Sequence, residues 1–292
     1  MQEENTRKVN INWFPGHMTK AKREMQEKLK LVDMVIECRD ARIPYSSRNP
    51  LLDELIQQKP RLIVFTKMDK ADKQVVEQWI EQIKDENTKI LTMNLLKDNV
   101  IQAVTVASKD CMKVMIERQK RRGINPRAIR AMVVGIPNVG KSTLINRIAK
   151  KKAVQAADRP GVTKALQWVK VNRDLELLDT PGVLWPRFDD EKVAMVLAVT
   201  GAIRDQILPI DDVCEYAMRF MIRHYPHLLA ERYGIEVSDD PFVNLERIAK
   251  QRHFVLANHQ LDMDRTIQHF IREVRDDSLG RICWEFVDEN EQ

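Results

Sequence analysis

The sequence has few cysteines, no long apolar run and no internal repeat, and each absence excludes a class of protein. Its four cysteines (Cys38, Cys111, Cys214 and Cys283) are far apart, and none forms a CxxC pair or a set with metal-ligand spacing. We therefore expect reduced thiols, with neither a disulfide framework nor a zinc centre. No apolar stretch approaches membrane-spanning length, and residues 1–12 lack the apolar core of a secretory signal. These absences predict a cytoplasmic protein with no membrane partner.

Charge is distributed unevenly between the two ends of the chain. Residues 205–292 hold 10 Lys and Arg against 18 Asp and Glu, which leaves 38 against 25 of the totals 48 and 43 for residues 1–204. Basic runs lie at residues 20–23, 118–122 and 150–152, with Arg127 and Arg130 close to the second. A solvated lysine-rich face explains most such runs. Their concentration in one part of the chain favours an electrostatic contact with a nucleic-acid backbone.

Short β-rich runs alternate with helical patterns over the first two-thirds of the chain. This alternation predicts an α/β domain with a mostly parallel sheet and helices on both faces. Asn172-Arg173-Asp174 has the composition of a hairpin turn. The predicted strands are 32–38, 62–65, 90–93, 132–134, 166–171 and 175–178, and the predicted helices are 72–84 and 100–121.

The pattern changes after about residue 204. Asp211-Asp212 can cap a helix whose apolar stripe contains Val213, Ala217 and Phe220, and a second apolar face begins at Ile267, with Gly280 as its expected stop. We therefore predict two domains in a chain of 292 residues. Residues 1–204 would be the α/β domain with an N-terminal extension, and residues 205–292 a smaller all-helical C-terminal domain.

The strongest motif is Gly135-Ile-Pro-Asn-Val-Gly-Lys141-Ser142, which matches the phosphate-binding pattern GxxxxGK[ST]. It follows the apolar run 131–134 and opens a helical run, which is the context that the pattern requires. Backbone N–H groups of such a loop cradle the β-phosphate, Lys141 neutralises phosphate charge and Ser142 coordinates Mg²⁺. The loop residues expected to bind the nucleotide are Asn138, Val139, Gly140, Lys141, Ser142 and Thr143.

Two further patterns follow this loop at the spacing of a nucleotide switch. Asp179-Thr-Pro-Gly182 comes directly after a predicted strand, so Asp179 can reach Mg²⁺ through water and the Gly182 N–H can reach the γ-phosphate. Between them, Thr163 in Pro160-Gly-Val-Thr163 can complete the Mg²⁺ shell. Either pattern alone is more often an ordinary turn, and only their position after the loop gives them weight.

A guanine-reading pattern, Thr66-Lys67-Met-Asp69, ends a predicted strand far upstream of the phosphate loop. Asp69 can accept hydrogen bonds from guanine N1 and N2, and the stem of Lys67 can cover the base. Thr66 stands where Asn is commoner, which would weaken the tie to the phosphate loop. Met93 and Asn94 occupy the place that usually closes the base pocket, where a backbone N–H can serve guanine O6.

The order of these motifs is rotated, because the guanine motif usually comes last. With Trp13-Phe-Pro-Gly-His17-Met and Cys38-Arg-Asp-Ala-Arg-Ile-Pro44 near the N-terminus, the whole chain resembles the circularly permuted ribosome biogenesis GTPase A family (YlqF-type). The resemblance implies a circularly permuted P-loop GTPase domain followed by a helical domain. It also implies Mg²⁺-dependent GTP hydrolysis, binding to ribosomal RNA and proteins of the immature large ribosomal subunit, and a role late in its maturation.

The same resemblance suggests two catalytic features. Val183 stands where many GTPases have a water-orienting glutamine, and the resemblance points to His17 as the replacement, although a histidine packed against Trp13 is equally compatible with the sequence. Asn138 matches the pattern of potassium-assisted GTPases, in which K⁺ supplies positive charge, but it can also simply rigidify the loop. We expect slow hydrolysis alone, stimulation by the particle, release after hydrolysis, and a monomer off the ribosome.

Two other functions fit parts of the sequence. The protein can be an RNA- or protein-binding module in which GTP is a structural ligand without significant turnover. It can also be a P-loop kinase of small molecules, although the guanine motif and the lack of an acceptor-site base argue against this. Turnover with ribosomal particles and nucleotide competition separate the three possibilities.

Overall fold

The computed structural model describes residue 23 and residues 25–56, 59–148, 167–180, 190–203, 205, 208–276 and 278–289. By their contacts, these residues form two compact units. One contains the described residues from 23 to 180 together with 285–289, and the other contains those from 190 to 284. We describe each unit separately.

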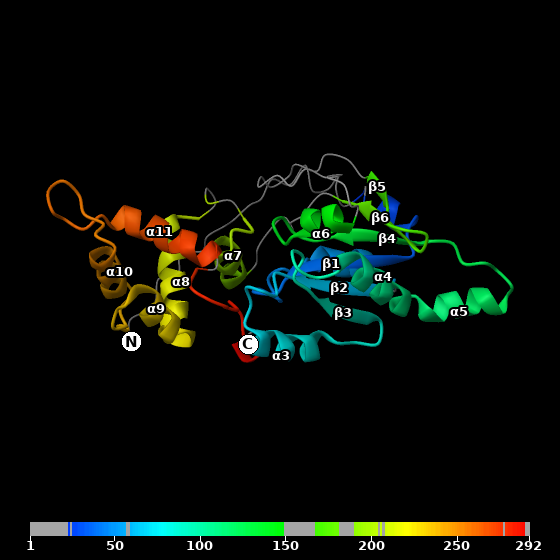
Figure 1. Ribbon diagram of the computed structural model, residues 1–292, viewed down its shortest axis with the longest axis horizontal. Coiled ribbons are helices and arrows are strands. Elements are labelled where there is room, and N and C mark those ends of the chain that lie inside the picture. Colours follow the sequence, from blue (N-terminus) through cyan, green and yellow to red (C-terminus); the bar gives the residue numbers. More distant parts are fainter. Residues whose placement is uncertain are drawn as a thin grey trace. The chain divides into compact units, whose positions relative to one another are not determined.

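The first unit contains a six-stranded sheet with the strand order β3-β2-β1-β4-β6-β5 (Figure 1). All neighbouring strands are parallel except the hairpin β5–β6, whose turn is at residues 171–174. This confirms the predicted α/β class and the predicted hairpin. The strands are β1 (Met34–Asp40), β2 (Arg61–Thr66), β3 (Thr88–Thr92), β4 (Ile129–Val134), β5 (Gln167–Lys170) and β6 (Leu175–Asp179).

The central strands are buried on both faces, as a parallel sheet covered by helices requires. Every residue of β1 is buried, and β2 and β4 each have one partly exposed residue near the start of the strand. The helical segment 25–29 and helix α2 pack on one face of the sheet, where they meet alternate residues of β1, β4 and β6. The helices of this unit are α2 (Pro50–Ile56), α3 (Lys73–Ile83), α4 (Val100–Cys111), α5 (Lys113–Arg121) and α6 (Lys141–Ile148).

The predicted helix over 100–121 is two helices, α4 and α5, divided at Met112. Met112 is buried, whereas α5 has no buried residue, so only α4 packs against the sheet. Figure 1 shows α5 standing off from the strands of its unit. The sequence periodicity did not show the break because Met112, Met115 and Ile116 continue the apolar pattern of α4 into α5.

The second unit is helical. Its longest helix, α8, begins at Ile210, so Asp211 and Asp212 lie in its first turn and do not cap it. Helix α11 ends at Arg275 with Asp276 as its C-cap, so Gly280 is not the stop that the sequence predicts. The helices are α7 (Glu191–Val199), α8 (Ile210–His224), α9 (Pro226–Tyr233), α10 (Pro241–Gln251) and α11 (Met263–Arg275), and a short 3₁₀ turn, η1 (Val287–Glu289), belongs to the first unit.

The division between the units differs from the predicted boundary at 204/205. Helix α7 lies before that boundary, yet it packs with α8 and α11. Arg275 of α11 donates hydrogen bonds to the carbonyls of Ala198 (2.8 Å) and Val199 (3.3 Å), in the last turn of α7, where carbonyls lack regular helical partners. The last described residues, 285–289, return to the sheet unit, which a boundary drawn from local patterns cannot anticipate.

Candidate nucleotide-binding site

The phosphate loop lies between β4 and α6, where the pattern predicts it. Gly135 has room for hydrogen only, because a Cβ there would lie 2.9 Å from the carbonyl oxygen of Cys38. Asn138 and Gly140 have φ of 61° and 87°, the left-handed conformation that turns successive N–H groups inward. Burial raises the pKa of the Cys38 thiol to about 12, so this neighbour of the loop stays neutral at pH 7.

Lys141 is the first residue of α6 and points at the end of β6. Its Nζ donates a hydrogen bond to Asp179 Oδ1 at 2.6 Å, and the two side chains are 5% and 1% exposed. This buried pair compensates both charges and joins the phosphate loop to the DxxG motif. A phosphate chain would offer Lys141 a second anionic partner at the same place.

The groups around Asp179 fit a magnesium ion held with a nucleotide. Asp179 Oδ2 is buried and has no hydrogen-bond partner in the described part of the chain, and Ser142 stands in the first turn of α6. Among the described residues there is no group of three or more His, Cys, Asp or Glu that could hold a metal alone. This donor set matches Mg²⁺, which is commonly bound by one or two protein oxygens together with phosphate and water.

The guanine motif ends β2 and is joined directly to the phosphate loop. The hydroxyl of Thr66 donates a hydrogen bond to the carbonyl of Val139 at 2.6 Å, although 73 residues separate them. Thr66 is fully buried, and a Cβ on Gly140 would lie 3.4 Å from its hydroxyl. Thr66 therefore provides the tie that the sequence suggests it would weaken. The parallel pairing β2–β1–β4 brings these motifs to the same end of the sheet.

Lys67 is held in place by an acidic residue from the end of β1. Its Nζ donates to Asp40 Oδ2 at 2.8 Å, and Arg42 donates to the same carboxylate through its backbone and guanidinium nitrogens. Burial alone would raise the pKa of Asp40, but Arg42 and then Lys67 lower it well below its ordinary value. Burial lowers the pKa of Lys67, an effect that Asp40 opposes. Asp40 and Arg42 belong to the CRDARIP stretch, and residue type alone does not mark either of them as part of a base pocket.

The loop after β3 lies beside the phosphate loop through Leu95, whose Cδ1 would be 3.2 Å from a Cβ on Gly140. Its two predicted N–H donors are already used. Met93 donates to the carbonyl of Phe65 (2.9 Å), and Asn94 donates to Asp98 (2.7 Å). For the N–H of Leu95, no such partner occurs among the described residues.

Three predicted site residues, His17, Thr163 and Gly182, lie outside the described residues, as does Val183. Within the described part, the sheet brings together Thr66, Lys67, Val139, Gly140, Lys141 and Asp179, as the contacts above show, and Asp69 follows three residues after Thr66. Asp69 is exposed. The residues that the sequence did not single out are Asp40, Arg42 and Leu95. Of these, only Asp40 and Arg42 had a signal, the unusual CRDARIP stretch.

Comparisons with known proteins identify the family of this chain. The family model "50S ribosome-binding GTPase" matches residues 130–226. The ribosome biogenesis GTPase A of Bacillus cereus is 48% identical over 280 residues, covering 96% of this chain and 95% of the relative. The chain belongs to the ribosome biogenesis GTPase A family. The counterpart from Priestia megaterium is 47% identical over 97% of this chain and 99% of its own.

Solved structures of YlqF have the same fold as this family member. A GDP-bound YlqF is similar with a TM-score of 0.64 and 26% identity, covering 91% of this chain and all of that one. A GNP-bound YlqF from T. maritima gives 0.61 and 27%, covering 91% and 98%. The predicted family, a GTPase of ribosome biogenesis, is therefore confirmed. None of the described helices is long and apolar enough to cross a membrane.

Proposed function

We propose that this GTPase binds a precursor of the large ribosomal subunit, promotes its late maturation, and hydrolyses GTP on the particle in order to leave it. The observation that carries the proposal is the convergence of the Thr66 and Lys141 motifs through the bond from Thr66 to Val139. Opposite ends of one guanosine nucleotide then meet residues from distant parts of the chain. The names of the relatives refer to ribosome biogenesis, and this supports a ribosomal particle as the binding partner.

In this proposal Asp69 accepts the N1 and N2 hydrogens of guanine, the stem of Lys67 covers the base, and the Leu95 N–H donates to O6. Lys141 and the loop N–H groups bind the β- and γ-phosphates. Ser142, Thr163 and Asp179 hold Mg²⁺, Asp179 through water, and Gly182 donates to the γ-phosphate. The ion neutralises charge on the phosphates when bound.

The catalytic group that acts on water is His17 in our proposal, because Val183 cannot hold a water molecule. An imidazole nitrogen can orient or deprotonate the attacking water once the particle brings residue 17 to the nucleotide. The test is His17→Ala, which should remove particle-stimulated hydrolysis while leaving GTP affinity unchanged. Undiminished stimulation would assign His17 a packing role.

A potassium ion beside Asn138 is a further part of the proposal, since Asn138 belongs to the phosphate loop and has the inward-turned conformation of φ 61°. We expect faster turnover in K⁺ than in Na⁺ at equal ionic strength. Equal rates would leave Asn138 as a rigidifying residue.

The basic helix α5 is proposed to bind the RNA of the particle. It has no buried residue, its last turn contains Arg118, Lys120 and Arg121, and the Arg121 side chain is 82% exposed. A helix with clustered cations and no buried residue in the described part of the chain is suited to phosphate contacts. The predicted site of action is the cytoplasm, and the protein is expected to be a monomer off the ribosome.

The deciding experiment is GTP turnover by the full chain with and without immature large subunits, in Mg²⁺ and K⁺ buffer. The proposal predicts slow turnover alone and a clear increase with particles. Absent turnover with particles would favour the alternative in which GTP is a structural ligand. Mature subunits serve as the control for particle specificity.

A further inference from the structure

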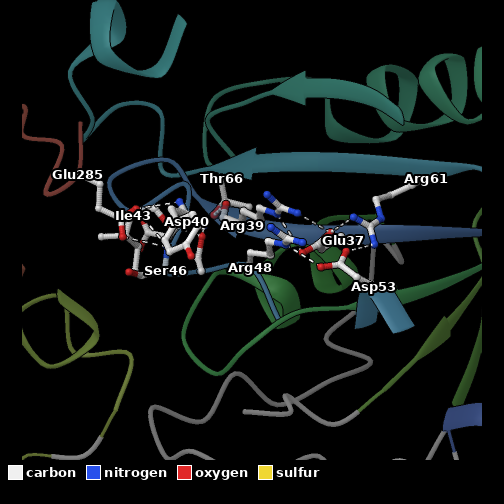
Figure 2. Close-up of polar contacts among 12 residues, drawn as sticks. Glu37, Arg39, Asp40, Ile43, Ser46, Arg48, Asp53, Arg61, Thr66 and Glu285 are labelled. Atoms are coloured by element: carbon white, nitrogen blue, oxygen red, sulfur yellow. Dashed lines mark hydrogen bonds and ion pairs between the residues drawn. The ribbon is translucent and has the colours of Figure 1, made fainter. Parts of the chain in front are cut away.

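Glu285 is a buried carboxylate that binds backbone far from it in the chain. Its side-chain oxygens accept hydrogen bonds from the N–H groups of Tyr45 (2.8 Å) and Ser46 (2.9 and 3.2 Å), and the residue is 1% exposed (Figure 2). Its own carbonyl accepts a hydrogen bond from Trp79 Nε1 at 3.1 Å. Charge-assisted bonds of this kind are among the stronger ones in proteins. Glu285 is thus anchored by both its side chain and its backbone.

The loop that Glu285 binds depends on this carboxylate for two of its N–H groups. Within the loop, Ile43 donates to the carbonyl of Asp40, Ser47 to that of Ile43, and Arg48 to that of Tyr45. The N–H groups of Tyr45 and Ser46 point instead to Glu285. Buried N–H groups without an acceptor are costly, so the loop conformation and the carboxylate stabilise each other.

The same loop begins at Asp40, the residue that holds Lys67. The N–H of Asp40 donates to Ser47 Oγ (3.1 Å), and Ser47 Oγ donates to the carbonyl of Ile43 (2.6 Å). The N–H of Ala41 donates to the carbonyl of Thr66 at 3.0 Å. Lys67, with φ of 58°, takes a left-handed conformation that a lysine rarely adopts, so its pairing with Asp40 matters for its placement.

We infer that Glu285 is a positioning residue for the guanine pocket. By binding Tyr45 and Ser46 it fixes the loop, the loop fixes the Asp40 carboxylate, and Asp40 fixes Lys67 against the base. This inference rests on the proposed placement of guanine at Lys67 and Asp69. It gives residues 285–289, which follow the helical unit in the chain, a role in nucleotide affinity.

The test compares the GDP affinity of the wild-type chain with that of Glu285→Gln, by calorimetry in Mg²⁺ buffer. Glutamine keeps the shape of the side chain but removes its charge and places an NH₂ donor against an N–H donor. We expect GDP affinity to fall about fivefold, a loss typical of one charge-assisted bond or less. The matched control is Asp288→Asn, which makes the same charge change at an exposed residue of the same segment and should leave GDP affinity unchanged.

A double-mutant cycle separates positioning from a general effect on the fold. If Glu285 acts through Asp40, the variant with both Glu285→Gln and Asp40→Asn should bind GDP no more weakly than Asp40→Asn alone. Hydrogen exchange gives an independent readout. GDP should slow exchange of the Tyr45 and Ser46 amides in the wild type, because coupling between two sites is reciprocal.

The outcomes are distinguishable. A wild-type chain that does not bind GDP would overturn the proposed function and this inference with it. If the wild type binds GDP, either of two results would overturn the inference alone. One is that Glu285→Gln binds GDP as tightly as the wild type. The other is that its loss of GDP affinity adds fully to the loss caused by Asp40→Asn. If Glu285→Gln does not fold, Trp79→Phe removes the Nε1–H donor to the Glu285 carbonyl, together with part of the buried ring that stacks on Tyr45. Weakened GDP binding in that variant supports the inference, and unchanged binding contradicts it.

Discussion

The hydroxyl of Thr66 donates a 2.6 Å hydrogen bond to the carbonyl of Val139, and this bond joins the guanine motif to the phosphate loop. In the chain the guanine motif comes before the phosphate loop, yet β2, β1 and β4 are neighbours in the sheet. A nucleotide site depends on which strands adjoin and not on where the chain begins. The rotated order of motifs therefore leaves the site geometry intact.

Thr66→Val tests this tie, because valine has nearly the same shape and lacks the hydroxyl. The carbonyl of Val139 would lose its buried partner, which costs roughly 1–3 kcal/mol, so GDP affinity should fall by about tenfold, with a lower Tm. Calorimetry and thermal unfolding measure the two effects. Thr92→Val, at an exposed position at the end of β3, is the matched control and should change neither quantity. Equal GDP affinity in Thr66→Val would show that the bond does not shape the site.

Asp179→Asn tests the magnesium assignment. The wild-type protein should bind GTP more tightly in Mg²⁺ than in EDTA, and the variant should lose most of this difference because asparagine lacks the negative charge that attracts the ion. Its Tm without nucleotide should also fall, since Lys141 would lose its buried partner.

The control for this experiment is Asp174→Asn. Asp174 lies directly before the first residue of β6, at the end of the strand away from Asp179, and pairs with Lys109. It should keep the full effect of Mg²⁺ on GTP affinity. A full effect in Asp179→Asn as well would place the metal elsewhere.

The depressed pKa of Asp40 makes a pH-dependent contribution to stability. Because the folded-state pKa lies below the unfolded value of about 3.9, the contribution is fully present above that value and is lost as pH falls toward the folded pKa. The free energy of unfolding should therefore differ more between wild type and Asp40→Asn at about pH 7 than at about pH 3. Denaturant unfolding of both proteins at each pH checks this. A difference that grows on acidification has the wrong sign for the pairing of Asp40 with Arg42 and Lys67.

Charge reversal of Arg118, Lys120, Arg121 and Arg122 to Glu tests the role of α5. Because none of these residues packs in a core, the fold and GDP affinity should be unchanged, while binding to immature large subunits should weaken. The plot of log K against log salt should also become shallower by roughly 0.7–0.9 for each RNA phosphate that the helix no longer neutralises. Reversal of Lys84 and Lys97, exposed residues elsewhere on the same unit, is the control. Unchanged particle binding would remove α5 from the interface.

Much of the fold follows from local sequence patterns. All the predicted strands are observed, with bounds that differ by a few residues from the predicted ones. They were predictable because each is a short β-rich run flanked by polar or turn residues. The helix over 72–84 also occurs, with Asp72 as its N-cap and Lys84 as its C-cap. The phosphate loop was predictable because glycine, lysine and serine at that spacing meet a specific steric and electrostatic demand. Its neighbours Thr66 and Asp179 followed from motif order.

What the sequence did not show depends on contacts between distant residues. The break at Met112 reflects which half of a continuous helical pattern meets the sheet. Glu285 lies 239 residues from Ser46, and no local signal distinguishes it from the other acidic residues of its segment. Leu95 became a candidate only when the N–H partners of Met93 and Asn94 were known. Contacts of this kind are set by tertiary packing and not by residue type.

The most direct test of a shared site is base specificity in Asp69→Asn and Lys141→Ala, measured as the affinities for GDP and xanthosine diphosphate. Xanthine has a carbonyl where guanine has its N2 amino group, so an asparagine amide suits it better than a carboxylate does. We predict that Asp69→Asn loses GDP and gains xanthosine diphosphate, whereas Lys141→Ala loses both. If Asp69→Asn binds GDP as tightly as the wild type, the two segments do not hold one nucleotide and the account fails.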